Sequence, residues 1–253
     1  MRLVLLGHPD IASVMALTRL LELLPEHESR VFFSGPLGVS DGQPTALADL
    51  ARQDQRLLDQ FSESYALPKA ILESDDLPVP NSQESLALMH GWAPDLVLSV
   101  RYRRILREEF IAVPRLGVLN LHSGILPDYK GVMATFWALL HAETEIGCTL
   151  HWIRDSGIDT GPVIDIARLR ADYKSTYLAN VLALYGPGCR MMADAVNALA
   201  RGDSLGEEAQ QPCAGKYFST PGIDDIERFT AKGLRLAAPE DFAALNEVFT
   251  SEK

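Results

Sequence analysis

The chain has 253 residues, of which 47% are hydrophobic and 23% charged, as expected for a soluble globular protein with a substantial core. Its 34 acidic and 23 basic residues give a formal net charge of -11, which repels phosphate backbones and argues against a nucleic acid partner. No run approaches the roughly 18 consecutive apolar residues that a membrane span needs, so we expect no membrane partner.

Neither the cysteines nor the histidines form a metal-binding pattern. The three cysteines, Cys148, Cys189 and Cys213, fit no paired disulfide framework and no C-x-x-C motif, so we expect reduced thiols in a cytoplasmic protein. The histidines lack the H-x-x-x-H spacing of a zinc site, and no metal is expected.

The first part of the chain, to about residue 170, alternates short apolar runs with longer amphipathic stretches, which is typical of an α/β layered fold. The apolar run at residues 2–6 is too short for the core of a secretory signal and predicts a buried strand. A helix is predicted over residues 11–24, a short strand over 31–34, ended by Gly35 and Pro36, and a surface helix over 46–65.

Asn81 followed by Glu84 forms a capping-box pattern and predicts a helix that begins there and runs to about Trp92. Apolar runs then predict buried strands over residues 95–100, 118–121 and 148–153. Apolar and polar residues alternate over 163–169, which predicts an edge or antiparallel strand. The densest cationic patch is interpreted as solvated arginines of a loop and a helix start: Arg101, Arg103, Arg104 and Arg107.

After residue 170 the pattern becomes helical, with a predicted break at Gly186, Pro187 and Gly188. Two short helices are predicted at the end, over residues 223–232 and 239–250. We therefore predict one domain over residues 1–172 and a helical C-terminal extension over 173–253 that packs on the same domain.

Strands separated by helices imply parallel crossovers, and in such sheets the ligand binds beyond the carboxyl ends of the strands. The chain has no Walker loop, no G-x-G-x-x-G at its first helix and no G-x-S-x-G elbow, so nucleotide-driven and acyl-serine chemistries are not expected. The segment directly after residues 118–121 is therefore the most informative one.

Asn120 and His122 are two residues apart at a predicted strand end, so their side chains project from the same face. A second strand, at residues 148–153, runs into a loop that holds Asp155 and Asp159, and a carboxylate beside an imidazole would orient that ring. An amide, an imidazole and a carboxylate suit acyl-type transfer with no covalent enzyme intermediate. The alternative is a hydrogen-bonded structural pair and an aspartate that serves only in an Asx turn.

Three segments between residues 94 and 170 resemble the folate-dependent formyltransferases, in order and with matching spacing. The remaining residues before about position 90 match that family only in their general α/β pattern. The resemblance is carried by Asn120, His122, Leu126, Pro127, Tyr129 and Gly131, then by Gly147, Thr149, His151, Asp155, Asp159, Gly161 and Ile164, and upstream by residues 100–106.

This resemblance implies a Rossmann-like, mostly parallel sheet flanked by helices, with residues 1–172 as the catalytic domain. It implies transfer of a formyl group from the co-substrate 10-formyltetrahydrofolate to an amine. Asn120 would donate to the oxyanion, His122 would stabilise that oxyanion or accept the amine's proton, and Asp159 would hold His122 and relay protons. His151 would support these residues rather than act itself. The folate would be held by Tyr102, Arg104, Ile105, Leu106, Asp155, Ser156, Gly157 and Ile158.

Branches of this family differ in the acceptor of the formyl group. The purine-pathway enzyme has a glycine-rich phosphate-binding turn where this chain has Gly7, His8, Pro9 and Asp10. The initiator-tRNA enzyme has a further C-terminal barrel, whereas the segment after residue 172 is neither basic nor strand-rich. The folate hydrolase branch usually carries an N-terminal regulatory domain, which we do not expect here.

A small-molecule amine is therefore the expected acceptor, either an amino sugar nucleotide or an amino or hydroxyamino acid. The segment from Lys216 to Pro221 is expected either to shape the acceptor pocket or merely to pack on the sheet. Three alternatives stay open: a formyltetrahydrofolate hydrolase, a methionyl-tRNA formyltransferase-like protein without the RNA-binding domain, and a catalytically silent folate-binding protein. A homodimer is also considered.

Overall fold

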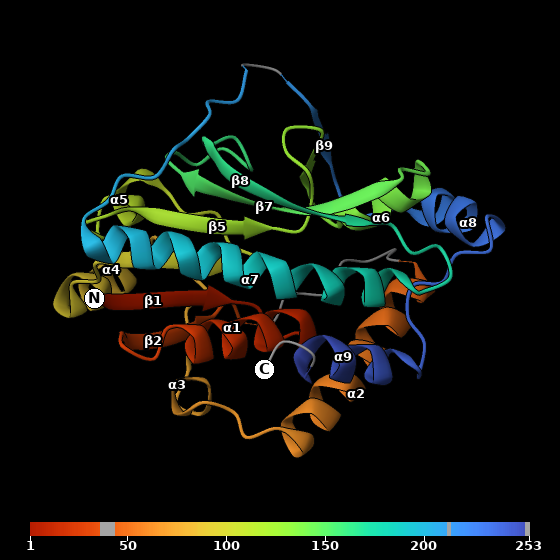
Figure 1. Ribbon diagram of the computed structural model, residues 1–253, viewed down its shortest axis with the longest axis horizontal. Coiled ribbons are helices and arrows are strands. Elements are labelled where there is room, and N and C mark those ends of the chain that lie inside the picture. The colour runs from red at the N-terminus through yellow and green to blue at the C-terminus, as the bar shows by residue number, and fades with distance from the viewer. Residues whose placement is uncertain (36–43, 212–213, 251–253) are drawn as a thin grey trace.

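A seven-stranded sheet forms the centre of the computed structural model, which describes residues 1–35, 44–211 and 214–250 (Figure 1). Its strand order is β3-β2-β1-β4-β5-β7-β8. The first five strands in this order are parallel, as the α/β pattern predicted: β3 (Asp75–Asp76), β2 (Glu28–Phe33), β1 (Arg2–Gly7), β4 (Leu96–Val100) and β5 (Val118–His122). The last two, β7 (Glu145–Ile153) and β8 (Val163–Arg170), are antiparallel to their neighbours.

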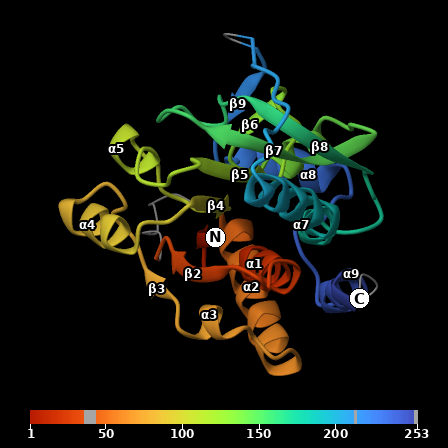
Figure 2. The same ribbon diagram turned by 60° about the vertical axis from the view of Figure 1, so that its left-hand side comes forward.

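Helices cover both faces of this sheet (Figure 2). Successive side chains of a strand point to opposite faces, so Leu3 and Leu5 of β1 belong to one core and Val4 and Leu6 to the other. Because both faces are covered, β1 and β4 are almost continuously apolar and buried. The first core lies under α1 (Ile11–Leu23) and α7 (Tyr177–Arg201), and the second under α4 (Gln83–Trp92) and α5 (Glu108–Ile111).

The helix α7 runs without interruption through the break that Gly186, Pro187 and Gly188 predicted, so that prediction was wrong. The two glycines are buried, and a Cβ on Gly188 would lie 3.0 Å from the sulfur of Cys148 and 3.2 Å from Leu121. The missing side chain thus lets the helix approach β5 and β7 closely. Burial of this helix face outweighs the hydrogen bond that the proline cannot donate.

The capping box predicted at Asn81 was also wrong. The N-cap of α4 is Ser82, whose hydroxyl oxygen accepts from the backbone N–H of Ser85 at 3.2 Å. Asn81 instead holds the loop after β4: its amide nitrogen donates to the carbonyl of Ile105 and its amide oxygen accepts from the N–H of Arg107, both at 2.8 Å. The Ile105 carbonyl and the Arg107 N–H are far from Asn81 in the sequence, so local spacing could not identify these partners.

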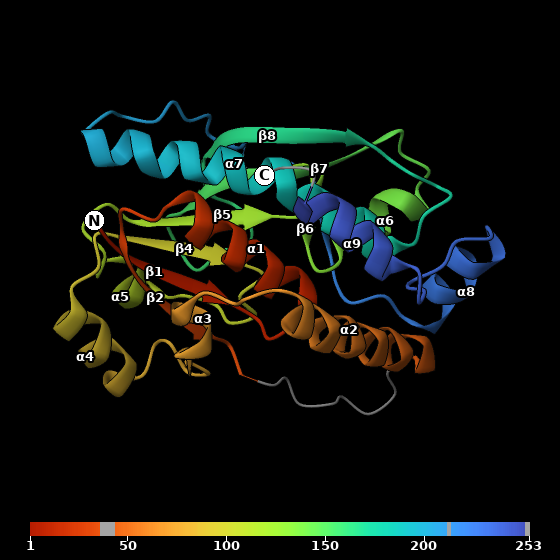
Figure 3. The same cartoon turned by 60° about the horizontal axis from the view of Figure 1, so that its bottom comes forward.

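The C-terminal segment contains a strand that the helical pattern did not predict. β9 (Lys216–Phe218) pairs with β6 (Tyr129–Gly131) in a separate two-stranded sheet. Helix α9 (Asp241–Thr250) contacts both α7 and α2 (Thr45–Ser64), as Figure 3 shows. The remaining short helices are α3 (Lys69–Leu72), α6 (Ala134–Leu140) and α8 (Ile223–Ala231).

The division of the chain at residue 172 stays a prediction. Within the described residues, no helix is both long and apolar enough to cross a membrane. Cys148 and Cys189 are buried and form no disulfide within the described residues, while Cys213 and Pro36 lie outside them.

Candidate active site

A cavity of about 730 Å³ opens at the carboxyl ends of the parallel strands. It is lined by the segments that follow β1 and β4, by the end of β5 and by the loop between β7 and β8. Ligand sites for small molecules have volumes of roughly 300–1,000 Å³, so the cavity is large enough for one extended ligand or two smaller ones.

Asn120 extends from β5 opposite His151 of β7. The amide nitrogen of Asn120 lies 2.9 Å from Nε2 of His151, and Nδ1 of the same ring lies 3.0 Å from the carbonyl oxygen of Trp152. Because a carbonyl can only accept, the ring hydrogen sits on Nδ1, and Nε2 accepts from the Asn120 amide. His151 therefore fixes which end of the Asn120 side chain is the donor.

His122 lies two residues further along β5 and is buried, with 8% of its surface exposed. Its Nε2 donates to the carbonyl oxygen of Tyr129 at 2.7 Å, and its Nδ1 lies 3.5 Å from Oδ2 of Asp159. Because a carbonyl can only accept, Nε2 carries the ring hydrogen, and Nδ1 is the nitrogen that faces the Asp159 carboxylate. A Cβ on Gly124 would lie 2.6 Å from Nε2, so the glycine leaves room for this ring position.

Asp159 joins the two histidines from the loop between β7 and β8. Its Oδ1 lies 3.5 Å from Nε2 of His151, and its Oδ2 accepts from the backbone N–H of Gly131 at 2.8 Å. Burial raises the pKa of the Asp159 carboxyl, but His122, His151 and the Gly131 N–H outweigh it and hold that pKa well below its usual range. The carboxylate is therefore ionised throughout the physiological pH range.

The backbone of Asp159 is in the left-handed region, with φ of 54°. Gln210 supports this conformation because its amide nitrogen donates to the carbonyls of Asp159 at 2.9 Å and of Gly161 at 2.7 Å. A non-glycine residue held at positive φ costs of order 1–3 kcal/mol and is often found at functional sites. Sequence reasoning missed Gln210, because nothing in the local pattern links it to this loop.

All eight residues that sequence analysis assigned to folate line the same cavity as Asn120, His122 and Asp159. Ile105 and Ile158 are 53% and 41% exposed, which is unusual for large apolar side chains. They line the cavity, so a flat ring packed against them would remove both side chains from water.

The loop that contains Ser156 is shaped by its own polar groups. Asp155 accepts from the N–H of Gly157 at 2.8 Å and from the hydroxyl of Thr160 at 3.1 Å. A Cβ on Gly157 would approach the Thr160 hydroxyl to 2.5 Å, so the turn requires glycine. Asp155 thus builds the turn rather than facing a ligand with a free carboxylate.

Tyr102 and Leu106 also line the cavity. The hydroxyl of Tyr102 donates to the carbonyl of Leu77, and burial raises the pKa of this phenol. Leu106 is only 4% exposed and belongs to the core under α4 and α5. These two residues anchor the loop between them, and the bonds from Asn81 fix the same loop from outside.

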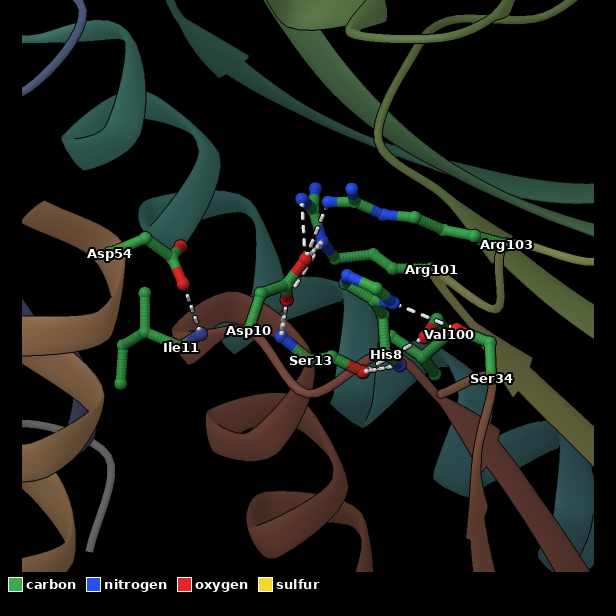
Figure 4. A network of polar contacts seen from close by, with 9 residues as sticks. All are labelled: His8, Asp10, Ile11, Ser13, Ser34, Asp54, Val100, Arg101 and Arg103. Carbon is green, nitrogen blue, oxygen red and sulfur yellow. Dashed lines mark hydrogen bonds and ion pairs between the residues drawn. The ribbon is translucent and has the colours of Figure 1, made fainter. Parts of the chain in front are cut away.

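The interpretation of the arginine patch as solvated was wrong for Arg101, while Arg103 is exposed but paired with Asp10. Arg101 donates from Nε and Nη2 to both carboxylate oxygens of Asp10 at 2.9–3.1 Å, and Arg103 donates from Nη2 to Oδ2 at 2.9 Å (Figure 4). Only 19% of the Arg101 side chain is exposed. Sequence reasoning missed this cluster because its members are about 90 positions apart in the chain.

The C-terminal segment reaches the cavity through Tyr217. The pairing of β9 with β6 places Tyr217 at the cavity. This pairing requires a glycine at position 131, because φ there is 93° and a Cβ would lie 2.3 Å from the carbonyl oxygen of Phe218. Since the same Gly131 donates to Asp159, the tail is coupled to the site. Within the described ranges, no cluster of three or more His, Cys, Asp or Glu side chains could hold a metal ion.

Residues 60–180 match the family model described as "Formyl transferase". The chain is 32% identical over 120 residues to a methionyl-tRNA formyltransferase of Synechococcus sp. (strain JA-3-3Ab), covering 47% of this chain and 37% of that protein. It is 28% identical over 217 residues to that of Bacteroides fragilis (strain YCH46), covering 77% and 64%. The chain thus spans less than two thirds of the length of these relatives.

Solved structures of formyltransferases share the fold. A sugar N-formyltransferase from Shewanella sp FDAARGOS_354 superposes with a TM-score of 0.59 at 15% identity, covering 98% of this chain and 87% of that one. A glycinamide ribonucleotide transformylase from Symbiobacterium toebii gives 0.58 at 20% identity, covering 83% and 94%. At these identities the superpositions establish the fold alone, and they agree with the predicted Rossmann-like class.

Proposed function

We propose that this chain, whose residues 60–180 match the formyl transferase model, transfers a formyl group from 10-formyltetrahydrofolate to the amine of a small-molecule acceptor. The observation that carries the proposal is the convergence of Asn120, His122 and Asp159 on one cavity. A cytoplasmic location and a homodimer stay predictions.

In the proposed reaction the amine nitrogen of the acceptor attacks the formyl carbon and a new C–N bond forms. The bond between that carbon and the folate nitrogen then breaks, and the proton lost by the amine ends on the folate nitrogen. Asn120 donates one amide N–H to His151, so its second N–H is the proposed donor to the formyl oxygen as negative charge develops there.

His122 and Asp159 carry the proposed proton transfer. His122 accepts the proton that the attacking amine loses, either directly or through a water molecule. The ionised Asp159 carboxylate, 3.5 Å from Nδ1, stabilises the positive charge that this creates on the ring. The carbonyl of Tyr129 holds the other ring nitrogen, so the ring keeps its orientation while its charge changes.

The proposed acceptor is a small molecule rather than a tRNA. The curated relatives are described as methionyl-tRNA formyltransferases, but the net charge of -11 disfavours a polyanionic partner. Sugar N-formyltransferases among the structural neighbours are consistent with a small amine at this fold.

The test is to incubate the protein with 10-formyltetrahydrofolate and a panel of amines, and to detect the mass gain of one formyl unit. Asn120→Ala should lose turnover while it still binds tetrahydrofolate, whereas the matched control His90→Ala, at an exposed position on α4, should keep the parent rate. Rapid formate release with no amine present would instead favour a hydrolase. Parent-like transfer by Asn120→Ala would contradict its role as oxyanion donor.

A further inference from the structure

The crevice between β1 and β4 is the point at which the order of the parallel strands reverses. In open α/β sheets this switch point is where ligands enter, at the carboxyl ends of the strands. Asp10 follows β1, and Arg101 and Arg103 follow β4, so their ion pairs span the crevice (Figure 4). The same cavity wall continues to Asn120 and His122 on β5.

The N-terminus of α1 faces this crevice, but its donors are already used. Oδ1 of Asp10 accepts from the N–H of Ser13 at 2.8 Å, and Oδ2 of Asp54, from α2, accepts from the N–H of Ile11 at 3.1 Å. A phosphate bound at a helix N-terminus needs these same N–H groups. The protein's own carboxylates therefore exclude a phosphate from the place where many α/β folds bind one.

Figure 4 draws four charged groups, Arg101, Arg103, Asp10 and Asp54, and the charges of these four balance only when Asp54 is ionised. Arg101 and Asp10 stay charged because each lowers the free energy of the other's ionised form. His8 is neutral at physiological pH, since burial and the nearby Arg103 lower its pKa to about 4. Burial and the neighbouring Asp10 carboxylate raise the pKa of Asp54 to about 7, so a cation placed beside Asp54 would favour its ionised form.

Arg103 is the cation of this cluster that is most open to a ligand. Its side chain is 40% exposed and lines the cavity, and within the described part of the chain it donates through Nη2 to Asp10. A guanidinium has five N–H donors in a planar fork that matches a carboxylate. In Figure 4, Asp10 lies between Asp54 on one side and the two guanidinium groups on the other.

We propose that this crevice binds the head group of an amino acid acceptor, with its α-carboxylate on Arg103 and its α-ammonium on Asp54, so that a side-chain amine reaches Asn120 and His122. This inference rests on the proposed function and names the class of acceptor. A zwitterion leaves the four charged groups of the crevice balanced, because two cations and two carboxylates meet one charge of each sign. A phosphorylated acceptor would place two further negative charges beside Asp10 and Asp54, which is costly in a buried site.

The test compares acceptors that differ in one charge. L-Ornithine carries both head-group charges, putrescine lacks the carboxylate, and Nα-acetyl-L-ornithine lacks the α-ammonium. Since a hydrogen bond to a charged group contributes about 1.5–3 kcal/mol, kcat/KM for L-ornithine should exceed that for either analogue by roughly 10- to 100-fold. L-Lysine and cadaverine, one methylene longer, form a second matched pair.

Two variants assign these preferences to their residues. Arg103→Met should abolish the preference for L-ornithine over putrescine, and Asp54→Asn should abolish the preference over Nα-acetyl-L-ornithine. Asparagine can still accept from the Ile11 N–H, and Arg103 is half-exposed, so both variants should fold, which a thermal melt checks. Preferences that survive in both variants would overturn the assignment.

The outcomes separate this inference from the function on which it rests. If an amino sugar nucleotide is formylated and no amino acid is, the acceptor class is wrong and the formyl transfer stands. If no amine is formylated although tetrahydrofolate binds, the proposed function fails. Calorimetry of L-ornithine binding to the protein with tetrahydrofolate then decides the head-group site independently, because absence of binding, or equal binding by Arg103→Met, overturns it.

Discussion

Asp159→Asn isolates the charge of the carboxylate from its structural role. Asparagine can still accept from the N–H of Gly131, and it tolerates the left-handed backbone at φ 54° better than most residues. What is lost is the negative charge 3.5 Å from Nδ1 of His122. At an effective dielectric constant of about 20, two unit charges at that separation attract by about 5 kcal/mol, so kcat should fall about 10³-fold.

The assay is single-turnover formyl transfer at saturating 10-formyltetrahydrofolate and acceptor, so that binding does not limit the rate. Tetrahydrofolate affinity and the thermal midpoint should stay near the parent values, because Asp159 touches the histidines and Gly131. A matched control is Asp155→Asn, which should weaken folate binding more than kcat, since Asp155 orders the turn at Gly157. A kcat for Asp159→Asn within tenfold of the parent would refute the charge-pairing role.

Three further predictions follow from the same contacts. Asn120→Ala should lower kcat by about 10²- to 10³-fold in the transfer assay, as for removal of one oxyanion donor. The raised pKa of Asp54, about 7 when folded against about 3.9 unfolded, means that its ionisation opposes folding. The free energy of unfolding should therefore fall as pH rises from about 4 to about 7, and Asp54→Asn should raise the thermal midpoint more at pH 8 than at pH 5. Gly188→Val should lower the free energy of unfolding in urea by about 1–3 kcal/mol, because the new side chain on α7 would clash with Cys148. The control is Gly91→Ala on α4, where an added Cβ would meet no atom within 4 Å, and it should raise the free energy of unfolding by about 0.5–1 kcal/mol.

The fold follows from the sequence where the signal is local. Continuous apolar runs at residues 3–6 and 96–98 predicted strands buried on both faces, and the intervening amphipathic stretches predicted parallel crossovers. The run at residues 148–153 predicted a strand but not its direction, because orientation is set by the partner. The break predicted at Gly186 to Gly188 failed for a related reason: local helix propensity there is poor, and tertiary packing decides.

In the candidate site, as in the fold, only the local features could be predicted from the sequence. Asn120 and His122 follow from period-two spacing at a strand end, whereas Asp159 emerged only from the family resemblance, because an aspartate in a glycine-rich loop is usually a turn residue. The contacts of Gln210 and the pairing of Asp10 with Arg101 could not be predicted. Each joins segments far apart in the chain, and a single sequence contains no signal for such a pair.

The carboxyl groups of Asp159 and Asp54 line one cavity, and their pKa values are displaced in opposite directions, in keeping with the two roles proposed for them. Asp159 lies beside His122, His151 and the backbone N–H of Gly131, whose combined effect outweighs burial, so its carboxyl group stays ionised. Asp54 has one N–H donor and a neighbouring carboxylate, so burial prevails and a cation beside it would favour its ionised form. When the surroundings of two acids displace their pKa values in opposite directions, the two groups can serve different purposes. One can stay charged throughout a reaction, and the other can become charged when a cationic ligand binds. These two environments support the proposals that the chemistry takes place at the end of β5 and that the acceptor is recognised at the crevice between β1 and β4.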